Sequence, residues 1–565
     1  MKRDEALASI KQKPEVSVLI IGAGINGIGI FRDLALQGVN VLMVDKDDFC
    51  SKTSAATSRM IHGGLRYLEN GEFRLVRESV RERNRLLQNA PHYVKPQLTT
   101  IPIFTWFSGL LNAPLKFIGA RDEPTDRGAV VIKIGLSLYD WYTRQQKAVP
   151  QHYFSSRSKS LELHPQLNPE IVCTASYYDA QMPYAERIGI ELILDAEADC
   201  PHAKAINYLS LVSAQNKVIK LQDEITKSAY AVEPNLVVNA TGPWIDSANH
   251  CMGRQTHFIQ GTKGSHIILE NNELWMALGN EMFFFENDDG RIVMMCGLED
   301  KVIVGSTDIH IHDPDLARCT PEEVDYFISM INVVFPDIFV DRTQIVFEFS
   351  GVRPLPPSQA SRTGQISRDH SVKLLEPGDG LQFPIYSLVG GKWTTFNAFA
   401  EEVTDSLLNR LGQIRITNTN DLPIGGGRNF PLTDSAQRQW LSSMQTRTGI
   451  PFNRMKELLE RYGTRAELVA TFIIDDEDRP LKYKPDLSHR EVAFLTLNEK
   501  VAHLDDILLR RTLLGMLGEL SSDLIDEIAT IVGEELGWSA NRRRKEIKRS
   551  LDILSDYHGV ELTDT

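Results

Sequence analysis

The chain has 565 residues, of which 42% are hydrophobic and 24% charged, so it is long enough for two or three folded domains with buried cores. Its formal net charge of -14 argues against a nucleic-acid-binding protein, which needs a broad basic surface. The 6 cysteines stand singly, without a C-x-x-C pair, which disfavours an iron–sulfur or zinc module, and we predict no metal site.

The start of the chain, Met1 to Pro14, is charged and does not resemble a secretory signal. We therefore expect a cytoplasmic protein with reduced thiols. A later apolar stretch, Ile101 to Ile118, is interrupted by two prolines and a lysine, which disfavours a transmembrane helix. This stretch is either buried core or a segment that lies on a membrane surface.

A βαβ unit is predicted near the start of the chain. The run Val16 to Ile21 is typical of a buried parallel strand, residues 28 to 37 have a helical pattern, and Val39 to Val44 form a second strand. Gly22, Gly24 and Gly27 stand between the first strand and the helix. This spacing suits a tight turn that approaches a pyrophosphate. Asp45 ends the second strand, where a carboxylate can accept hydrogen bonds from ribose hydroxyls, so the unit predicts a dinucleotide site.

Four segments place a cation beside turn-forming or hydroxyl residues. The longest, Thr53 to Glu69, suits a loop that wraps a flavin pyrophosphate and offers a cation to a substrate anion. The others are Ser350 to Pro354, Ile366 to His370 and Gly390 to Thr395. Four cationic loops in an acidic protein predict one shared anion pocket.

Further along the chain, other elements can be predicted. Residues 74 to 85 are densely charged with helical spacing, and Leu236 to Ala240 is a buried strand that ends at a small-residue turn. Antiparallel strands are expected near residues 283–285, 292–295 and 301–304. After the glycine-rich stretch at residues 422–427, the pattern is almost wholly helical.

These segments together resemble the FAD-dependent glycerol-3-phosphate dehydrogenase family of the respiratory, quinone-linked type. The hallmarks are Ile61 to Glu69, Gly351 to Pro354, the Arg368-Asp369 pair and Gly390 to Thr395. The likeness runs from about residue 16 to residue 545 and includes Lys263-Gly-Ser-His266, Gly305-Ser-Thr-Asp308 and Leu504 to Thr512. The chain departs from the family at Cys296-Gly-Leu298 and at Thr241, where alanine is common.

The resemblance implies an α/β fold of the Rossmann-like, two-dinucleotide-binding, D-amino-acid-oxidase-like type, with an antiparallel-sheet substrate domain and a C-terminal helical domain. Residues 1–415 are expected to form the FAD-dependent oxidoreductase domain and residues 416–565 the helical domain. Within the first domain, the FAD-binding parts are expected near residues 16–95, 170–255 and 350–415, and the substrate parts near residues 96–169 and 256–349.

The resemblance also implies the reaction: FAD-dependent oxidation of sn-glycerol 3-phosphate to dihydroxyacetone phosphate by hydride transfer from C2 to flavin N5. Electrons would pass to a membrane quinone. The residues expected at the substrate are Arg66, Tyr67, Arg353, Arg368 and Lys392, with His62, Arg353 and Lys392 as catalytic groups. The residues expected at FAD are Gly22, Ala23, Gly24, Ile25, Asn26, Gly27, Asp45, Lys46, Thr53, Ser54, Ser58, His62, Gly63, Gly64, Ala240, Thr241, Gly242, Gly391, Lys392, Thr394 and Thr395.

Several roles have alternatives. His62 is the expected proton acceptor, but it can instead bond flavin or backbone groups while Arg353 or Lys392 stabilises the developing alkoxide. The arginines can form internal salt bridges, for which Asp369 is a ready partner of Arg368, and the hydroxyls can cap helices. His370 is expected as a solvated turn residue.

The main alternative functions are a glycerol-3-phosphate oxidase that uses oxygen and another FAD-dependent oxidoreductase of the same fold. The expected partners are glycerol 3-phosphate and a membrane quinone, with peripheral contact at the inner face of the plasma membrane, a homodimer and no nucleic acid.

Overall fold

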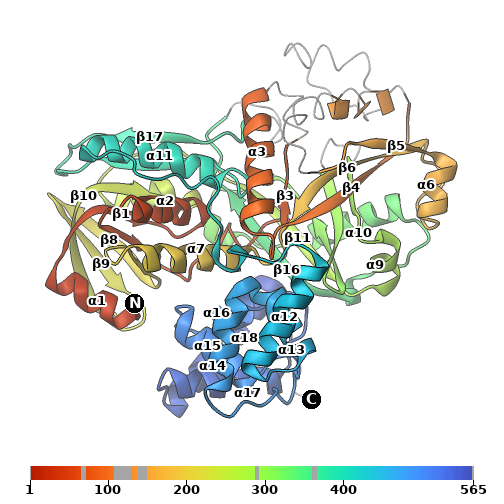
Figure 1. Cartoon of the computed structure of the whole chain (residues 1–565). Coiled ribbons are helices and arrows are strands. Elements are labelled where there is room, and N and C mark those ends of the chain that lie inside the picture. The colour runs from red at the N-terminus through yellow and green to blue at the C-terminus, as the bar shows by residue number, and fades with distance from the viewer. Residues whose placement is uncertain are drawn as a thin grey trace.

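The computed structural model describes residues 2–64, 72–106, 129–130, 132–133, 135–137, 149–286, 292–358 and 366–562 (Figure 1). Two β-sheets stand side by side in Figure 1, and the C-terminal helices lie below them. The long helix α3 (Phe73–Asn89) rises between the two sheets. The predicted helix over residues 74–85 lies within α3.

The first sheet has the strand order β17-β18-β10-β1-β2-β7, and the β8–β9 hairpin continues from β10. Strands β18, β10, β1, β2 and β7 run parallel, and β17 is antiparallel to β18. The strands are β1 (Glu15–Ile21), β2 (Val41–Val44), β7 (Lys204–Ile206), β8 (Leu209–Gln215), β9 (Val218–Asp223), β10 (Ala229–Asn239), β17 (Ser371–Leu375) and β18 (Ile385–Val389). On one face, α2 (Ile25–Leu36) packs between α7 (Ala185–Asp199) and α11 (Phe396–Leu411). The predicted βαβ unit is therefore present as β1-α2-β2.

The second sheet has the order β15-β11-β14-β13-β12-β4-β6-β3, with β16 on β11 and β5 on β6. Its strands are β3 (Met60–Ile61), β4 (Lys95–Ile103), β5 (Tyr153–Ser156), β6 (Cys173–Gln181), β11 (Thr262–Leu269), β12 (Met282–Glu286), β13 (Ile292–Leu298), β14 (Lys301–Gly305), β15 (Ile309–His310) and β16 (Ile345–Arg353). β12, β13 and β14 pair antiparallel, at the positions predicted for three such strands. The boundaries expected between the substrate parts and the FAD-binding parts, near residues 170 and 350, lie just before β6 and within β16.

The remaining helices outside the C-terminal region cover the ends and edges of the sheets. They are α1 (Arg3–Gln12), α6 (Arg157–Leu163), α8 (Ile245–Cys251), α9 (Asn272–Leu278) and α10 (Pro321–Val334). Helix α10 begins with a capping box in which Thr320 and Glu323 exchange hydrogen bonds, so its first turn is stabilised locally.

The C-terminal region is helical, as predicted. Its helices are α12 (Asp434–Thr448), α13 (Phe452–Tyr462), α14 (Ala466–Ile474), α15 (His489–Asn498), α16 (Leu504–Asp506), the π-helical turn η8 (Ile507–Arg511), α17 (Ser522–Glu535) and α18 (Ala540–His558). Their apolar faces share one hydrophobic core with Ile268, Phe347 and Phe349 of the second sheet. This shared core anchors the helices to the rest of the molecule.

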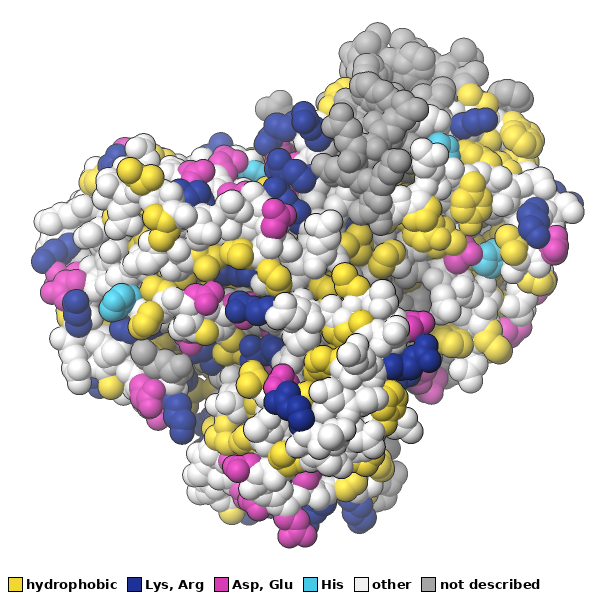
Figure 2. All heavy atoms as spheres, in the orientation of Figure 1, with side chains coloured by type: hydrophobic (Ala, Val, Ile, Leu, Met, Phe, Trp, Pro, Cys, Tyr) yellow, Lys and Arg dark blue, Asp and Glu magenta, His cyan; other side chains and the backbone are white. Residues whose placement is uncertain are grey.

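None of the helices in the described ranges has the length and apolar character needed to cross a bilayer. In the apolar stretch Ile101 to Ile118, residues 101–103 end strand β4, and residues 107–118 lie outside the described part. Figure 2 shows basic side chains gathered over α3, where Arg74, Arg77 and Arg81 are exposed. The opposite face of α3 is buried and carries Ser79 and Arg83 inward.

Candidate active site

A cavity of about 440 Å³ lies at the carboxyl ends of β1, β2 and β10. This edge of a doubly wound sheet is where dinucleotides bind. The sequence-predicted cofactor residues that line it are Gly22, Ala23, Gly24, Ile25, Asn26, Asp45, Lys46, Thr53, Ser54, Ala240, Thr241, Gly242, Gly391 and Lys392. Segments from four distant parts of the chain thus meet around one space.

The glycine turn forms the floor of this cavity. Gly22 has a φ of +105°, and a Cβ added there would lie 2.5 Å from the Ala240 carbonyl oxygen. A Cβ at Gly27 would lie 2.1 Å from the Gly22 carbonyl oxygen, so Gly27 lets α2 pack closely on the turn. Gly24 is the N-cap residue of α2 and supplies no side chain there. The Ile25 amide in the first turn donates to Ser54 Oγ at 2.9 Å.

The Asp45 carboxylate lies on the cavity wall. Its Oδ2 accepts from the Ala23 amide at 2.6 Å, and its Oδ1 accepts from the Asp47 amide at 2.9 Å. Burial, followed by the negative charge of Asp47, raises the pKa of Asp45 to about 7. A further hydrogen-bond donor such as a ribose hydroxyl would favour the ionised form.

The hydroxyl residues predicted at the cofactor differ in their contacts. Thr53 donates to the Val352 carbonyl at 2.9 Å, and Thr241 donates to Asn239 Oδ1 at 2.7 Å. Thr395 Oγ1 is buried and has no hydrogen-bond partner among the described residues. The predicted residues that do not line the cavity are Gly27, Ser58, His62, Gly63, Gly64, Thr394 and Thr395.

Two of the predicted substrate arginines are joined by one carboxylate. Arg353 Nη1 donates to Asp308 Oδ1 at 3.1 Å, and Arg368 Nη2 donates to Asp308 Oδ2 at 2.8 Å. The Arg353 guanidinium lies against Gly264, where an added Cβ would be 2.3 Å from Nη2. Arg368 therefore pairs with Asp308 and not with its neighbour Asp369, which pairs with Arg74.

Lys392 and His62 form a second part of the site. Lys392 Nζ donates to Ser79 Oγ at 2.7 Å, and the His62 amide donates to Thr394 Oγ1 at 3.3 Å. Burial, followed by the positive charges of Lys392, Arg368 and Arg83, lowers the pKa of His62 to about 3. His62 is therefore neutral at pH 7 and lies among cations from separate segments. Arg66 and Tyr67 lie outside the described residues.

His266 is a site residue that the sequence analysis did not single out. Its Nε2 lies 2.8 Å from Ser58 Oγ, and its ring stacks on Phe349 at 4.8 Å. Burial, followed by the charges of Arg353 and Arg59, lowers the pKa of His266 to about 3. The sequence did point to His266, because Lys263 to His266 is among the segments that carry the family resemblance.

His370 is buried rather than solvated. Its ring stacks on Phe399 at 4.3 Å, and its Nε2 lies 3.2 Å from Glu402 Oε2. The expectation of a solvated turn was wrong because α11 covers the imidazole, which the turn-forming neighbours of His370 in the sequence do not reveal.

Comparison with known proteins identifies the family. Residues 17–401, more than half of the chain, match the family described as FAD dependent oxidoreductase. The chain belongs to this family. Residues 417–543 match the C-terminal domain of alpha-glycerophosphate oxidase. The protein is therefore an FAD-dependent oxidoreductase, as the motifs predicted.

Individual relatives agree with the motif-based resemblance. A glycerol-3-phosphate dehydrogenase of Synechocystis is 31% identical and aligns over 95% of this chain and 96% of its own. D-erythritol 1-phosphate dehydrogenase of Brucella abortus is 29% identical, over 88% of this chain and 95% of its own. The structure of a glycerol-3-phosphate dehydrogenase from Bacillus halodurans complexed with FAD has a TM-score of 0.74 at 22% identity and covers 98% of this chain and 97% of that one. The predicted family and fold are confirmed.

The cavity residues fit FAD. Gly22 and Gly391 line the cavity, and a Cβ at either position would clash with the Ala240 carbonyl oxygen or with the Asn26 side chain, so only glycine keeps this part of the wall in place. Asn26 Oδ1 is buried without a hydrogen-bond partner in the described structure. Gly24, the N-cap residue, supplies no side chain at the amino end of α2, which is an anion-binding position, although Ser54 Oγ accepts from the Ile25 amide there. We propose that these residues bind the pyrophosphate and that Asp45 binds a ribose.

Replacing Asp45 with asparagine tests the ribose role. Since the Asp45 pKa is about 7 and bound ribose favours the carboxylate, lowering the pH below 7 should weaken FAD binding by about tenfold per pH unit in the wild type. Asp45→Asn should bind FAD more weakly and lose this pH dependence. The measurement is FAD titration of the apoprotein by flavin fluorescence between pH 5.5 and 8.5, roughly one to two pH units on each side of the Asp45 midpoint. Asp315→Asn, at a more exposed wall residue, is the control. If Asp45→Asn keeps the wild-type pH dependence of FAD binding, Asp45 does not bind the ribose.

Proposed function

We propose that the enzyme oxidises sn-glycerol 3-phosphate to dihydroxyacetone phosphate. FAD, when bound, accepts at N5 the hydride that leaves C2. The main supporting observation is that His62 lies within electrostatic range of two cations, Arg368 and Lys392, and that Lys392 also lines the cofactor cavity. The names of relatives that act on glycerol 3-phosphate or D-erythritol 1-phosphate support a phosphorylated polyol as substrate.

We assign phosphate recognition to Arg353 and Arg368. Guanidinium groups bind phosphate oxygens in bidentate fashion, and Asp308 holds both groups in fixed orientation. Asp308 also offsets part of their charge, which limits repulsion between the two arginines before substrate binds. Lys392 donates to Ser79, and in this proposal it would stabilise negative charge as the C2 hydroxyl loses its proton.

We propose His62 as the proton acceptor for the C2 hydroxyl. In the substrate-free site its pKa is lowered to about 3, largely by burial and then by the surrounding cations. A bound phosphate dianion would oppose these positive charges and raise the His62 pKa toward the working range. His266, which is also neutral and lies beside Arg353, is the competing candidate. Single His62→Gln and His266→Gln variants separate the two roles.

The proposed electron acceptor is a membrane quinone. The dehydrogenase names of the relatives support this choice, whereas the match to an oxidase C-terminal domain supports oxygen as the alternative. Reaction with a quinone requires peripheral contact with the membrane, which we place at the cytoplasmic face. A homodimer stays a prediction.

Anaerobic reduction of the flavin tests the substrate and the acceptor separately. We expect glycerol 3-phosphate to bleach the visible flavin absorbance, and amino acids to leave it unchanged. Rapid recovery with a soluble quinone and slow recovery with air would support the dehydrogenase. Equally fast recovery with air would identify an oxidase, and absence of bleaching by glycerol 3-phosphate would refute the proposed substrate.

A further inference from the structure

The cofactor loop, which we define as residues 45–54, borders the FAD cavity but contains no helix or strand. Backbone hydrogen bonds hold its first residue and its middle. The Leu209 amide donates to the Asp45 carbonyl at 2.7 Å, and the Cys50 amide donates to the Ala23 carbonyl at 3.0 Å. Because the loop carries Asp45, Thr53 and Ser54 to the cofactor, a shift of its backbone would move several groups at once.

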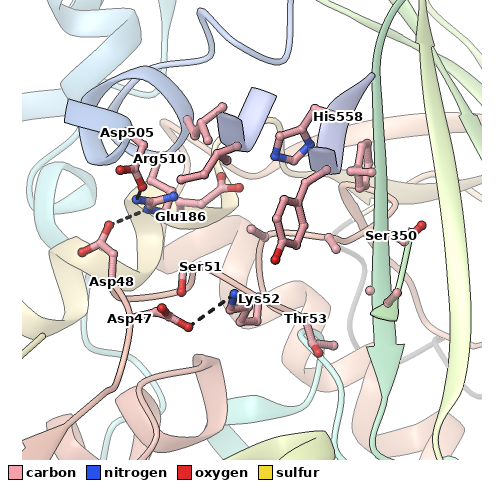
Figure 3. Close-up of a pocket in the computed structure, with 18 of the residues that line it drawn as sticks. Asp47, Asp48, Ser51, Lys52, Thr53, Glu186, Ser350, Asp505, Arg510 and His558 are labelled. Atoms are coloured by element: carbon pink, nitrogen blue, oxygen red, sulfur yellow. Dashed lines mark hydrogen bonds and ion pairs between the residues drawn. The ribbon is translucent and has the colours of Figure 1, made fainter. Parts of the chain in front are cut away.

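Asp48, in the middle of the cofactor loop, is ion-paired to the C-terminal helices. Arg510 Nε donates to Asp48 Oδ2 at 2.6 Å, and Arg511 donates to both carboxylate oxygens, at 2.7 and 3.1 Å. The exposed fractions of the Asp48, Arg510 and Arg511 side chains are 0%, 7% and 1%. In Figure 3, Arg510 extends from the C-terminal helices to Asp48 on the loop. The two guanidinium groups hold the pKa of Asp48 below its usual value although burial opposes them.

The two arginines are themselves held within the C-terminal region. Both lie in the π-helical turn η8, and Arg510 also pairs with Asp505 and Asp506, at 2.7 and 2.6 Å. Arg511 Nε donates to the Glu499 carbonyl at 3.0 Å. The loop therefore binds to a pre-organised pair of cations.

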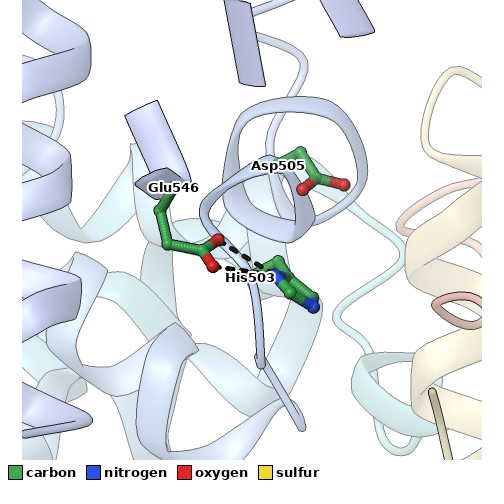
Figure 4. A group of neighbouring side chains, drawn as sticks. All are labelled: His503, Asp505 and Glu546. Carbon is green, nitrogen blue, oxygen red and sulfur yellow. Dashed lines mark hydrogen bonds and ion pairs between the residues drawn. The ribbon is translucent and has the colours of Figure 1, made fainter. Parts of the chain in front are cut away.

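A group of possible metal ligands adjoins these arginines. His503 lies 3.0 Å from Glu546, and Asp505 lies close to both (Figure 4). Asp505 pairs with Arg510 and Arg549, and Glu546 pairs with Arg542 at 2.6 Å. The carboxylates already neutralise arginines, so the group extends the ion-pair network instead of offering ligands to a metal.

Beyond Asp48, a cavity separates the cofactor loop from the C-terminal helices. This space of about 310 Å³ is bordered by Ser51, Lys52 and Thr53 on the loop side and by Tyr557 and His558 on the α18 side (Figure 3). Across this space Lys52 Nζ lies 5.9 Å from the centre of the Tyr557 ring, and such an exposed cation–π contact supports the loop only weakly. The Asp48 ion pairs are thus a point where the C-terminal helices hold the loop directly.

We propose that Arg510 and Arg511 are positioning residues for FAD, which act through Asp48 to hold the cofactor loop in its binding conformation. The C-terminal helices thereby contribute to FAD retention although Arg510 and Arg511 do not line the FAD cavity. Buried ion pairs add little net stability because desolvation offsets their attraction, but they can specify one geometry. Arg510 and Arg511 belong to the segment Leu504 to Thr512, which is one of the segments that resemble the family, so the proposal gives this segment a physical role.

Two substitutions of Asp48 test this proposal. Asp48→Asn removes the charge with little change of shape, and Asp48→Glu keeps the charge but lengthens the link by one methylene. Both should accelerate FAD release from the purified holoenzyme and raise the FAD dissociation constant by about tenfold or more, or about 1.4 kcal/mol. The readouts are flavin fluorescence for FAD release and the thermal midpoint for stability.

Glu197→Gln is the matched control. Glu197 forms a similarly buried ion pair with Lys500 of the C-terminal region at 2.8 Å, but it lies on α7 and does not line the FAD cavity. We expect this variant to lose stability and to keep wild-type FAD affinity. If Asp48→Asn fails to fold, the FAD affinity of Asp48→Glu tests the proposal, because the glutamate charge still balances the arginines. FAD affinity within twofold of wild type in a folded Asp48 variant would overturn the proposal; this twofold limit is about 0.4 kcal/mol.

Discussion

Replacing Gly22 with alanine is expected to abolish FAD retention. The new Cβ would lie 2.5 Å from the Ala240 carbonyl oxygen, and Gly22 has a φ of +105°, which side-chain-bearing residues rarely adopt. Backbone strain and overpacking each cost about 1–3 kcal/mol. Because both act on the turn that receives the pyrophosphate, FAD affinity should fall by about 100-fold or more. The flavin-to-protein absorbance ratio of the purified protein measures this loss.

Gly38→Ala is the matched control for Gly22→Ala. Gly38 also has a positive φ, of +73°, but nothing lies within 4 Å of an added Cβ. It should therefore show a modest loss of stability and normal FAD content. If Gly22→Ala retains FAD as well as Gly38→Ala does, the close approach of β1 and β10 is not required for cofactor binding.

Replacing Arg353 with alanine is expected to lower kcat/KM for glycerol 3-phosphate by about 30-fold or more, since loss of a charge-assisted contact costs about 2–5 kcal/mol. FAD content should stay normal because Arg353 does not line the FAD cavity. Steady-state kinetics with a soluble quinone, together with the flavin absorbance, separates the two effects. Most of the loss should appear in KM if the guanidinium binds the phosphate equally in the ground state and the transition state.

Arg342→Ala serves as the control for Arg353→Ala. Arg342 is also paired with an aspartate, Asp325 at 2.7 Å, but both side chains are exposed, at 51% and 66%. This variant should keep wild-type kinetics, since exposed ion pairs contribute little. Normal kcat/KM in Arg353→Ala would instead show that Arg353 does not bind the substrate and serves only its bonds to Ser306, Thr307 and Asp308.

Much of the cofactor half of the protein was predictable from local patterns. The spacing of Gly22, Gly24 and Gly27 between a β-branched run and a helical run predicts the turn, because turn geometry and side-chain period are properties of neighbouring residues. The antiparallel strands β12 to β14 were predictable for the same reason. The arrangement of the substrate-binding side chains was less predictable, since they come from strands whose pairing partners are far away in sequence.

The βαβ unit, the flavoprotein family and the cations available for an anionic substrate could all be predicted from the residue pattern alone. The pairing of these cations depends on the folded chain: Arg368 pairs with Asp308 although Asp369 is adjacent to it, and Asp48 pairs with Arg510 of the C-terminal helices. Local conformation follows from short-range sterics, which neighbouring residues carry. The partner of a charged side chain depends instead on which distant segments the shared cores bring together, and on how burial makes each unpaired charge costly.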